Sequence, residues 1–183
     1  RIVFANSMLP KKGVLELSKA FNVIANKYKK SEIFFIGKLG HEQDGVSISQ
    51  MVLQNVEKKY HNRLKILGWL NSASEVYEYI STAHLCIYPS HMEGFGIAPV
   101  ESMALSKPTI FMKRGPGPEV IKDLESGLLV DPTDYNDIVK KIVMIFEDSD
   151  LSNTLSINGF IRSKKMFDLK KYSFQTTLNI INQ

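Results

Sequence analysis

Six short apolar segments, separated by stretches with a helical pattern, constrain the fold of this chain more than any other feature. The segments show little of the polar alternation that marks a strand with one solvated face. Such runs suit strands that are buried on both faces, which is the condition of a parallel sheet covered by helices. They are IVFA at 2–5, IFFI at 33–36, LKIL at 64–67, LCIY at 85–88, TIFM at 109–112 and LLV at 128–130.

Between these segments, apolar residues recur at the spacing of a helix face. The clearest faces are Leu17, Phe21, Ile24 and Tyr28, then Ala73, Val76, Tyr77 and Ile80, and then Ile138, Ile142, Ile145 and Phe146. Alternating strands and helices predict a doubly wound, Rossmann-like α/β fold whose ligands bind beyond the carboxyl ends of the parallel strands. From Asp150 onward we expect two terminal helices. The apolar side of the last one comprises Phe174, Thr177, Leu178 and Ile181.

Composition narrows the possible partners. The chain has 183 residues, which fits one domain, and 23 basic against 19 acidic residues give a net charge of +4. The basic residues are scattered, which argues against nucleic acid and suits a small anionic ligand or an anionic membrane surface. A single cysteine, Cys86, excludes an internal disulfide and fits a reducing compartment. No apolar run approaches the ~20 residues that span a bilayer.

The stretch YPSHMEGFGIAPVESMAL, at 88–105, places two glutamates around a glycine turn. It follows a predicted strand, so Glu93 lies on the loop at the ligand-facing edge, and Glu101 lies in the first turns of a helix that has Pro99 near its start. Gly94 and Gly96 leave backbone amides accessible, and the amino end of the helix adds positive potential. Such a site can hold phosphate on amides and hydroxyls on carboxylates. Glu101 as a mere partner of the helix dipole is the alternative.

This stretch resembles the E-x7-E signature of retaining glycosyltransferases with the two-domain GT-B fold, in particular the GT4 family. Further stretches resemble that family in the same order along the chain. They are LPKKGVLELSKAF, FFIGKL, LKILGWL and RGPGPEVIKDLESGLLVDP. The resemblance covers nearly the whole chain. It implies that residues 1–183 form the carboxyl-terminal domain that binds the sugar donor, and that the amino-terminal domain that holds the acceptor is absent from this chain, as the opening RIVFAN also suggests.

The resemblance also implies roles for individual residues. Glu101 accepts hydrogen bonds from the ribose of a nucleotide sugar, and Glu93 faces the donor sugar. Lys12 neutralises the diphosphate that leaves, a role that suits a flexible ammonium group. The glycine turn, which begins at Gly94, offers backbone amides to sugar hydroxyls and diphosphate. These amides belong to Phe95, Gly96 and Ile97.

The chain departs from the family at the end of its first strand. The family usually has Gly-Arg there, and this chain has Asn6 and Ser7. A second cation for the diphosphate is therefore missing from its usual place beside Ser7. Either activity is lower or a neighbouring cation has taken over, and the spacing does not choose among Lys11, Lys38, Lys113 and Arg114.

Other polar features are weaker signals. His91 precedes Glu93 by two residues and is a candidate donor contact, with polar surface as the alternative reading. Trp69 follows a predicted strand and either borders the base or packs in the core. The sequence DSD at 148–150 imitates a metal motif, but between two helices a capping or solvated role is favoured. We expect no metal site, and the histidines His41, His61 and His84 are not spaced as a cluster.

The sequence as a whole therefore predicts a retaining glycosyltransferase that moves a sugar from a UDP- or GDP-linked donor, without a cofactor, to a glycan or lipid-linked acceptor. The expected setting is cell-surface polysaccharide or lipopolysaccharide biosynthesis, in the cytoplasm or at the inner face of the membrane, with peripheral association of the full-length enzyme. Two alternatives stay open. They are a nucleotide-sugar-binding module without catalysis and a GT-B nucleotide-sugar epimerase.

Overall fold

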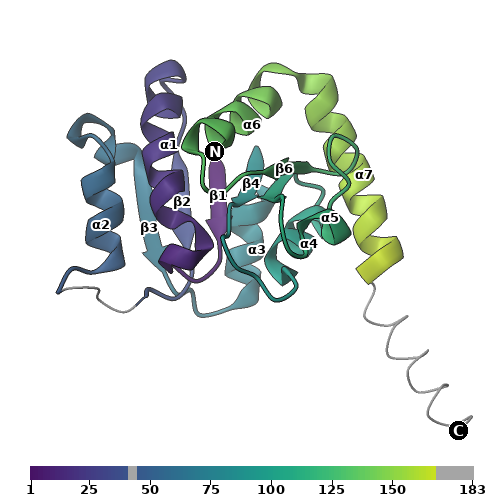
Figure 1. Ribbon diagram of the computed structural model, residues 1–183, viewed down its shortest axis with the longest axis horizontal. Coiled ribbons are helices and arrows are strands. Elements are labelled where there is room, and N and C mark those ends of the chain that lie inside the picture. Colours follow the sequence, from purple (N-terminus) through teal and green to yellow (C-terminus); the bar gives the residue numbers. More distant parts are fainter. Residues whose placement is uncertain (41–44, 168–183) are drawn as a thin grey trace, which may run out of the picture.

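A computed structural model describes residues 1–40 and 45–167 of the chain. Its centre is a sheet of parallel strands in the order β3-β2-β1-β4-β5-β6 (Figure 1). The strands are β1 (Ile2–Ala5), β2 (Ile33–Ile36), β3 (Leu64–Gly68), β4 (Leu85–Tyr88), β5 (Thr109–Met112) and β6 (Leu128–Val130). The six apolar segments thus become the six strands, and the predicted doubly wound fold is confirmed.

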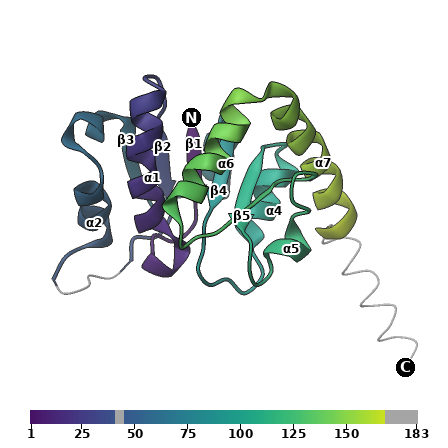
Figure 2. The same ribbon diagram turned by 45° about the horizontal axis from the view of Figure 1, so that its top comes forward.

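Helices cover both faces of the sheet, as Figures 1 and 2 show from two directions. One face carries α1 (Val14–Lys27), α2 (Ile48–Asn55) and α6 (Tyr135–Glu147). The opposite face carries α3 (Ala73–Ser81), α4 (Ile97–Ala104) and α5 (Gly117–Val120). The long helix α7 (Ser149–Phe167) closes the β6 side and packs against α4 and α6. Two 3-10 turns, Pro10–Lys12 and Lys58–Arg63, complete the described elements.

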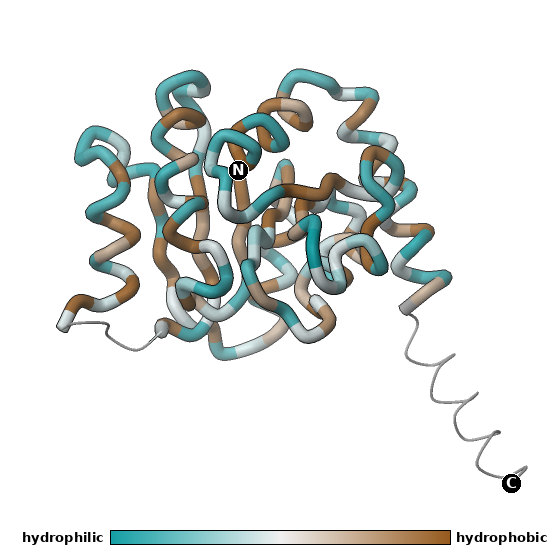
Figure 3. The backbone as a smooth tube through the Cα atoms, in the orientation of Figure 1, coloured by the Kyte–Doolittle hydropathy of each residue, from teal (hydrophilic) through white to brown (hydrophobic). Residues whose placement is uncertain are grey.

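The strand side chains explain why the apolar runs are continuous. Ile2 and Phe4 of β1 point into the core beneath α1 and α6, and Val3 points into the core beneath α3 and α4. All three are completely buried, because each face of the sheet is covered by helices. Figure 3 shows the same arrangement as hydrophobic strands in the centre of the chain with hydrophilic stretches on the outer helices.

Some helical predictions need correction. The face of α3 that was expected to pack in the core is buried completely only at Ile80, whereas Ala73 and Tyr77 are exposed. Helices α2 and α5 were not predicted, because eight and four residues are too few to display a periodic apolar face. The segment DSD has the capping role that was favoured: Asp148 Oδ1 accepts a hydrogen bond of 2.8 Å from the Leu151 amide at the start of α7. The last predicted helix lies outside the described residues.

A close approach between two backbones fixes the turn that leads into α1. Gly13 has φ of 75°, in the left-handed region that favours glycine, and a Cβ on it would lie 1.9 Å from the carbonyl oxygen of Pro89. Pro89 is the first residue after β4. The absence of a side chain at Gly13 therefore lets the turn after β1 rest directly on the turn after β4.

This contact gives a first prediction. Gly13→Ala should lower the free energy of unfolding by about 3 kcal/mol or more, because the substitution adds left-handed strain and a collision with Pro89. Gly45→Ala is the matched control, since Gly45 also has φ of 75° but, among residues 1–40 and 45–167, no atom lies within 4 Å of the added Cβ. Urea unfolding of both variants measures the difference, and equal losses would mean that the Pro89 contact is unimportant.

Candidate functional site

The six strands are parallel, so their carboxyl ends all lie at one edge of the sheet. At this edge the neighbouring strands β1 and β4 send their chains to opposite faces, because α1 packs on one face and α4 on the other. A crevice opens where the connections diverge in this way, and ligands of open α/β sheets bind there. The fold thus selects the turns after β1 and β4 as the place for a site.

Two adjoining cavities occupy this crevice. The first, which we call the α3 cavity, has a volume of about 360 Å³ and lies between the turns after β1, β2 and β3 and the exposed side of α3. The second, the glycine-loop cavity, has a volume of about 410 Å³ and is lined by residues 93–98. Asn6 and Glu101 line both cavities, so these two residues stand at their boundary.

Glu93 is held by a dense set of donors beside the glycine-loop cavity. Its Oε1 lies 2.7 Å from Lys12 Nζ, 3.0 Å from Asn6 Nδ2 and 3.3 Å from Ser90 Oγ. The side chains of Lys12 and Glu93 are only 14% and 10% exposed, so water screens this ion pair weakly. The structure therefore brings together the lysine and the glutamate that the sequence singled out, as direct partners of each other.

Asn6 has a fixed orientation at the boundary of the two cavities. Its Oδ1 accepts a hydrogen bond of 2.8 Å from the Ser7 amide, and its Nδ2 donates to Glu93. Because a carboxamide has one accepting and one donating end, the two contacts together define which end faces Glu93. Sequence reasoning named Asn6 only as a departure from the family and did not name Ser90, and both become functional candidates here. The contact of Asn6 with Glu93 depends on strands β1 and β4, which are adjacent only in space, whereas Ser90 lies three residues before Glu93 in the same turn.

Glu101 has a partner on a different helix. The phenol of Tyr77, in α3, donates a hydrogen bond of 2.9 Å to Glu101 Oε1, and both residues line the α3 cavity. This hydrogen bond is the main reason that the pKa of Tyr77 is raised above its ordinary value. The phenol stays protonated at neutral pH and can serve as a donor. The spacing of Tyr77 placed it on the apolar face of a helix, so its contact with Glu101 was not predicted.

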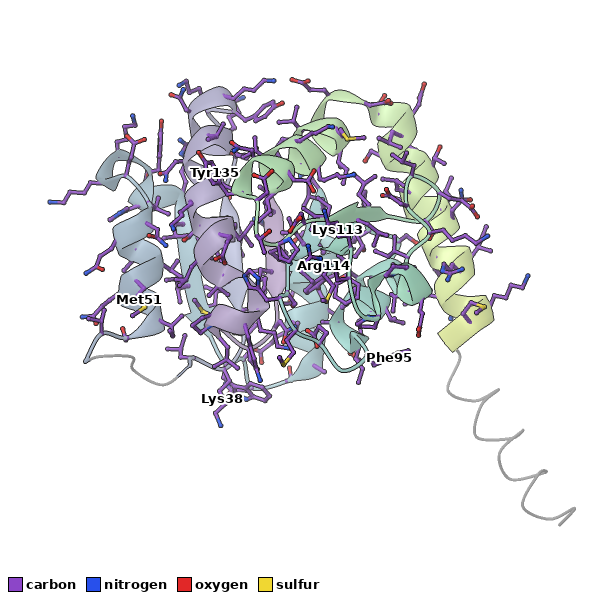
Figure 4. The ribbon with its side chains drawn as sticks, in the orientation of Figure 1. Lys38, Met51, Phe95, Lys113, Arg114 and Tyr135 are labelled. Carbon is purple, nitrogen blue, oxygen red and sulfur yellow. The ribbon has the colours of Figure 1, made fainter. Side chains whose placement is uncertain are left out.

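The glycine turn and the start of α4 form the wall of the glycine-loop cavity. Gly96 precedes α4 with φ of 96°, and a Cβ on it would lie 2.7 Å from the ring of Phe111. Helix α4 begins at Ile97 with Pro99 in its first turn, as predicted, and its first residues, Ile97 and Ala98, line the cavity. Gly94, Phe95 and Ile97 also line this cavity. Figure 4 shows Phe95 at the same edge of the molecule as Lys38.

His91 occupies a different place from the other predicted site residues. Its Nε2 lies 3.2 Å from Glu16 Oε2 in α1, and its backbone amide donates 2.8 Å to the carbonyl of Lys11. The imidazole is thus directed toward α1, and His91 lines neither the α3 cavity nor the glycine-loop cavity. These contacts tie the turn after β4 to the turn that carries Lys12.

The candidates for a second cation differ in position. Lys38 lines the α3 cavity together with Ser7 and lies on the lower edge in Figure 4. Lys113 forms an ion pair of 2.7 Å with Asp131, and this lysine is the main reason that the pKa of Asp131 lies below its usual range. Lys11 and Arg114 are exposed and line neither cavity. Lys38 is the cation that shares a cavity with Ser7.

Trp69 is 74% exposed and lines the α3 cavity, which excludes the alternative that it packs in the core. Within residues 1–40 and 45–167, no three His, Cys, Asp or Glu side chains come together as a set that could hold a metal ion. His61 and His84 belong to that part of the chain, and His41 does not.

No helix in the described ranges has the length and apolarity needed to cross a membrane.

Comparison with known proteins relates the chain to sugar-transferring enzymes. The family model for group 1 glycosyl transferases matches residues 1–162. An uncharacterized glycosyltransferase of Methanocaldococcus jannaschii is 32% identical over 163 residues, which are 89% of this chain and 43% of that protein. The chain spans less than half the length of the curated relatives that match it over most of its residues.

Solved structures share the fold. The carboxyl-terminal domain of a group 1 family glycosyl transferase from Francisella tularensis superposes with a TM-score of 0.80 at 25% identity, covering 92% of this chain and 86% of that one. Anabaena HepE in complex with UDP and glucose gives a TM-score of 0.87 at 22% identity, covering all of this chain and 48% of that one. The second likeness shows a common fold.

Proposed function

The chain belongs to the group 1 glycosyl transferases and has the fold of the carboxyl-terminal domain of a GT-B enzyme, and on this premise we propose that it binds a nucleotide sugar for transfer. The donor is a UDP- or GDP-linked sugar, and the acceptor is a glycan or a lipid-linked saccharide held by a second domain. The proposed setting is polysaccharide or lipopolysaccharide synthesis in the cytoplasm or at the inner face of the membrane.

The observation that carries this proposal is the pair of adjoining cavities. A nucleotide sugar has a nucleoside at one end, a sugar at the other and a diphosphate between them. The α3 cavity offers aromatic and apolar walls together with the Glu101 carboxylate, which suits a base and its ribose. The glycine-loop cavity offers Glu93 and the start of α4, which suits a sugar rich in hydroxyls. The boundary between the cavities is the proposed place of the diphosphate.

Three groups near the boundary can receive the diphosphate. The amides at the start of α4 provide hydrogen-bond donors and the positive end of the helix dipole. Asn6 contributes a neutral amide donor, and Lys12 contributes a positive charge. When the bond between the anomeric carbon and the phosphate oxygen breaks, negative charge accumulates on the departing diphosphate. Donors already fixed in position stabilise this charge without further rearrangement.

The charge balance implies that Lys12 changes partners. Lys38, Glu93 and Glu101 line the cavities, and Lys12 lines neither of them but lies 2.7 Å from Glu93. The two lysines and two glutamates carry formal charges that sum to zero. A diphosphate must therefore compete with Glu93 for Lys12. We propose that Lys12 moves from Glu93 to the diphosphate when the donor binds, and that Asn6 and Ser90 then hold Glu93 against the sugar.

The two other functions that the sequence allowed, epimerisation and binding without catalysis, differ from transfer in needing no site for an acceptor. An epimerase or a pure binding module would use the same donor cavities without a place for an acceptor. Retaining transfer needs a second domain that faces the carboxyl edge of the sheet. The sequence preceding residue 1 in the full-length protein distinguishes transfer from a binding module, because a second α/β pattern favours transfer and an unrelated domain favours a binding module.

Lys12 and Glu93 should affect nucleotide binding in opposite directions. Lys12→Ala is expected to lower the affinity for a nucleoside diphosphate roughly tenfold or more, because a charged hydrogen bond at the β-phosphate is lost. The affinity for the monophosphate should change little. Glu93→Gln is expected to raise the affinity for the diphosphate by up to about fivefold, because it removes the negative charge that competes for Lys12. Calorimetry measures both, and weakening by Glu93→Gln would contradict the exchange of partners.

Lys38 is the proposed substitute for the arginine that Ser7 replaces. Lys38→Ala should weaken binding of the nucleoside diphosphate by about fivefold, as expected for an exposed charge. Lys113→Ala is the control, because Lys113 is engaged with Asp131 outside both cavities. Calorimetric titrations of the two variants separate a local role of Lys38 from a general effect of positive charge. A larger loss of affinity for Lys113→Ala than for Lys38→Ala would contradict the role proposed for Lys38.

Transfer itself should require the rest of the protein. Positioning the acceptor beside the anomeric carbon can supply several kcal/mol of barrier reduction, on the order of 7 to 11 in favourable cases, and this chain contains only the proposed donor side. We expect no sugar transfer from a labelled nucleotide sugar by residues 1–183. Full-length protein should transfer with retention of the anomeric configuration in the presence of EDTA. Efficient transfer by the short chain, an inverted product, or loss of activity with EDTA would each contradict part of the proposal.

A further inference from the structure

The contact between Tyr77 and Glu101 is the most specific feature of the α3 cavity. The two residues come from different helices, α3 and α4, and are 24 positions apart in the sequence. Their hydrogen bond of 2.9 Å joins a phenol to a carboxylate, which is a charge-assisted contact. Both side chains reach the cavity surface, since both line the cavity. The pair is therefore accessible to a ligand.

Packing does not account for the presence of a tyrosine at this position. Tyr77 is 37% exposed, whereas the residue that anchors α3 to the sheet, Ile80, is completely buried. Another tyrosine on the same helix, Tyr79, behaves differently, because its ring packs against Phe34 at a centroid distance of 5.6 Å. The hydroxyl of Tyr77 instead donates a hydrogen bond to Glu101, and the side chain lines the cavity.

The hydrogen bond has a physical consequence for Glu101. A free glutamate side chain samples many rotamers, and ordering it on ligand binding opposes that binding. A phenol that already holds Oε1 removes part of this cost before the ligand arrives. An ionised carboxylate has about four acceptor positions. One phenol therefore leaves enough of them for the two neighbouring hydroxyls of a ribose.

We propose that Tyr77 is a positioning residue that orients the Glu101 carboxylate toward the 2′- and 3′-hydroxyls of the bound ribose, and that the pair thereby distinguishes ribonucleotides from 2′-deoxyribonucleotides. This inference rests on the proposed function, because it takes the ligand of the α3 cavity to be a nucleoside diphosphate. It gives a role to a residue on α3, whereas the other proposed ligand contacts come from the turns after the strands and from α4.

The raised pKa of Tyr77 agrees with this role. The hydrogen bond to Glu101 is its largest cause, so the phenol keeps its proton and remains a donor throughout the neutral range. The phenol is thus the donor of the pair, and the carboxylate oxygen is its acceptor.

The test is calorimetry on the 183-residue chain with UDP, GDP and their 2′-deoxy forms. Tyr77→Phe removes only the hydroxyl and keeps the ring. Tyr77→Phe should lower the affinity for the ribonucleotide that wild type binds by roughly twofold to tenfold, as expected for one hydrogen bond. The affinity for the 2′-deoxy form should change little. The ratio of the two affinities should fall accordingly. Tyr79→Phe is the matched control on the same helix and should leave both affinities unchanged.

A change in fold would lower both affinities and would not selectively alter their ratio. Thermal unfolding of each variant detects such a change in fold independently. In a Glu101→Ala background, Tyr77→Phe should have no further effect on affinity, because the positioned group is gone. Equal or tighter ribonucleotide binding by Tyr77→Phe would overturn the proposal and would identify the phenol as a competitor of the ribose. Absence of nucleotide binding by wild type would instead overturn the proposed function, and this inference with it.

Discussion

Burial of a parallel sheet on both faces is the constraint on which the rest of this structure depends. It requires helices on both sides, and it places every strand's carboxyl end at one edge. The order of the strands then makes β1 and β4 neighbours, although their paired residues Val3 and Cys86 lie 83 positions apart in the sequence, a pairing that no local pattern displays. Because their helices diverge to opposite faces, the crevice between the two turns follows from the topology alone.

Within that crevice, both glutamates have hydrogen-bonding partners before any ligand arrives. Glu93 holds Lys12, and Tyr77 holds Glu101. Such contacts avoid the cost of leaving partly buried charges without partners. In our proposal the diphosphate replaces Glu93 as the partner of Lys12, whereas the ribose hydroxyls join Tyr77 as donors to Glu101. A molecule with both a diphosphate and vicinal hydroxyls suits the two contacts.

The strands and the glycine turn were predictable because their causes are local. Runs such as IFFI show two-sided burial directly, and Gly96 with Pro99 marks the start of α4. Other features depended on tertiary contacts that a sequence does not display. Tyr77 has the spacing of an apolar helix face, yet its hydroxyl donates a hydrogen bond to Glu101 at the α3 cavity. The contact of Asn6 with Glu93 crosses 87 positions. The choice of Lys38 among four cations required the shape of the cavity.

The central claim is that a nucleotide occupies the crevice at the carboxyl edge, across both cavities. Titration of UDP and GDP into the isotopically labelled chain, followed by amide and indole chemical shifts in NMR spectra, tests it most directly. The account predicts shifts at the amides of residues 94–98 in the glycine-loop cavity and at the indole of Trp69, the single tryptophan, in the α3 cavity. Shifts confined to the opposite edge, around Ser31 and His84, or no shifts with either nucleotide, would contradict it.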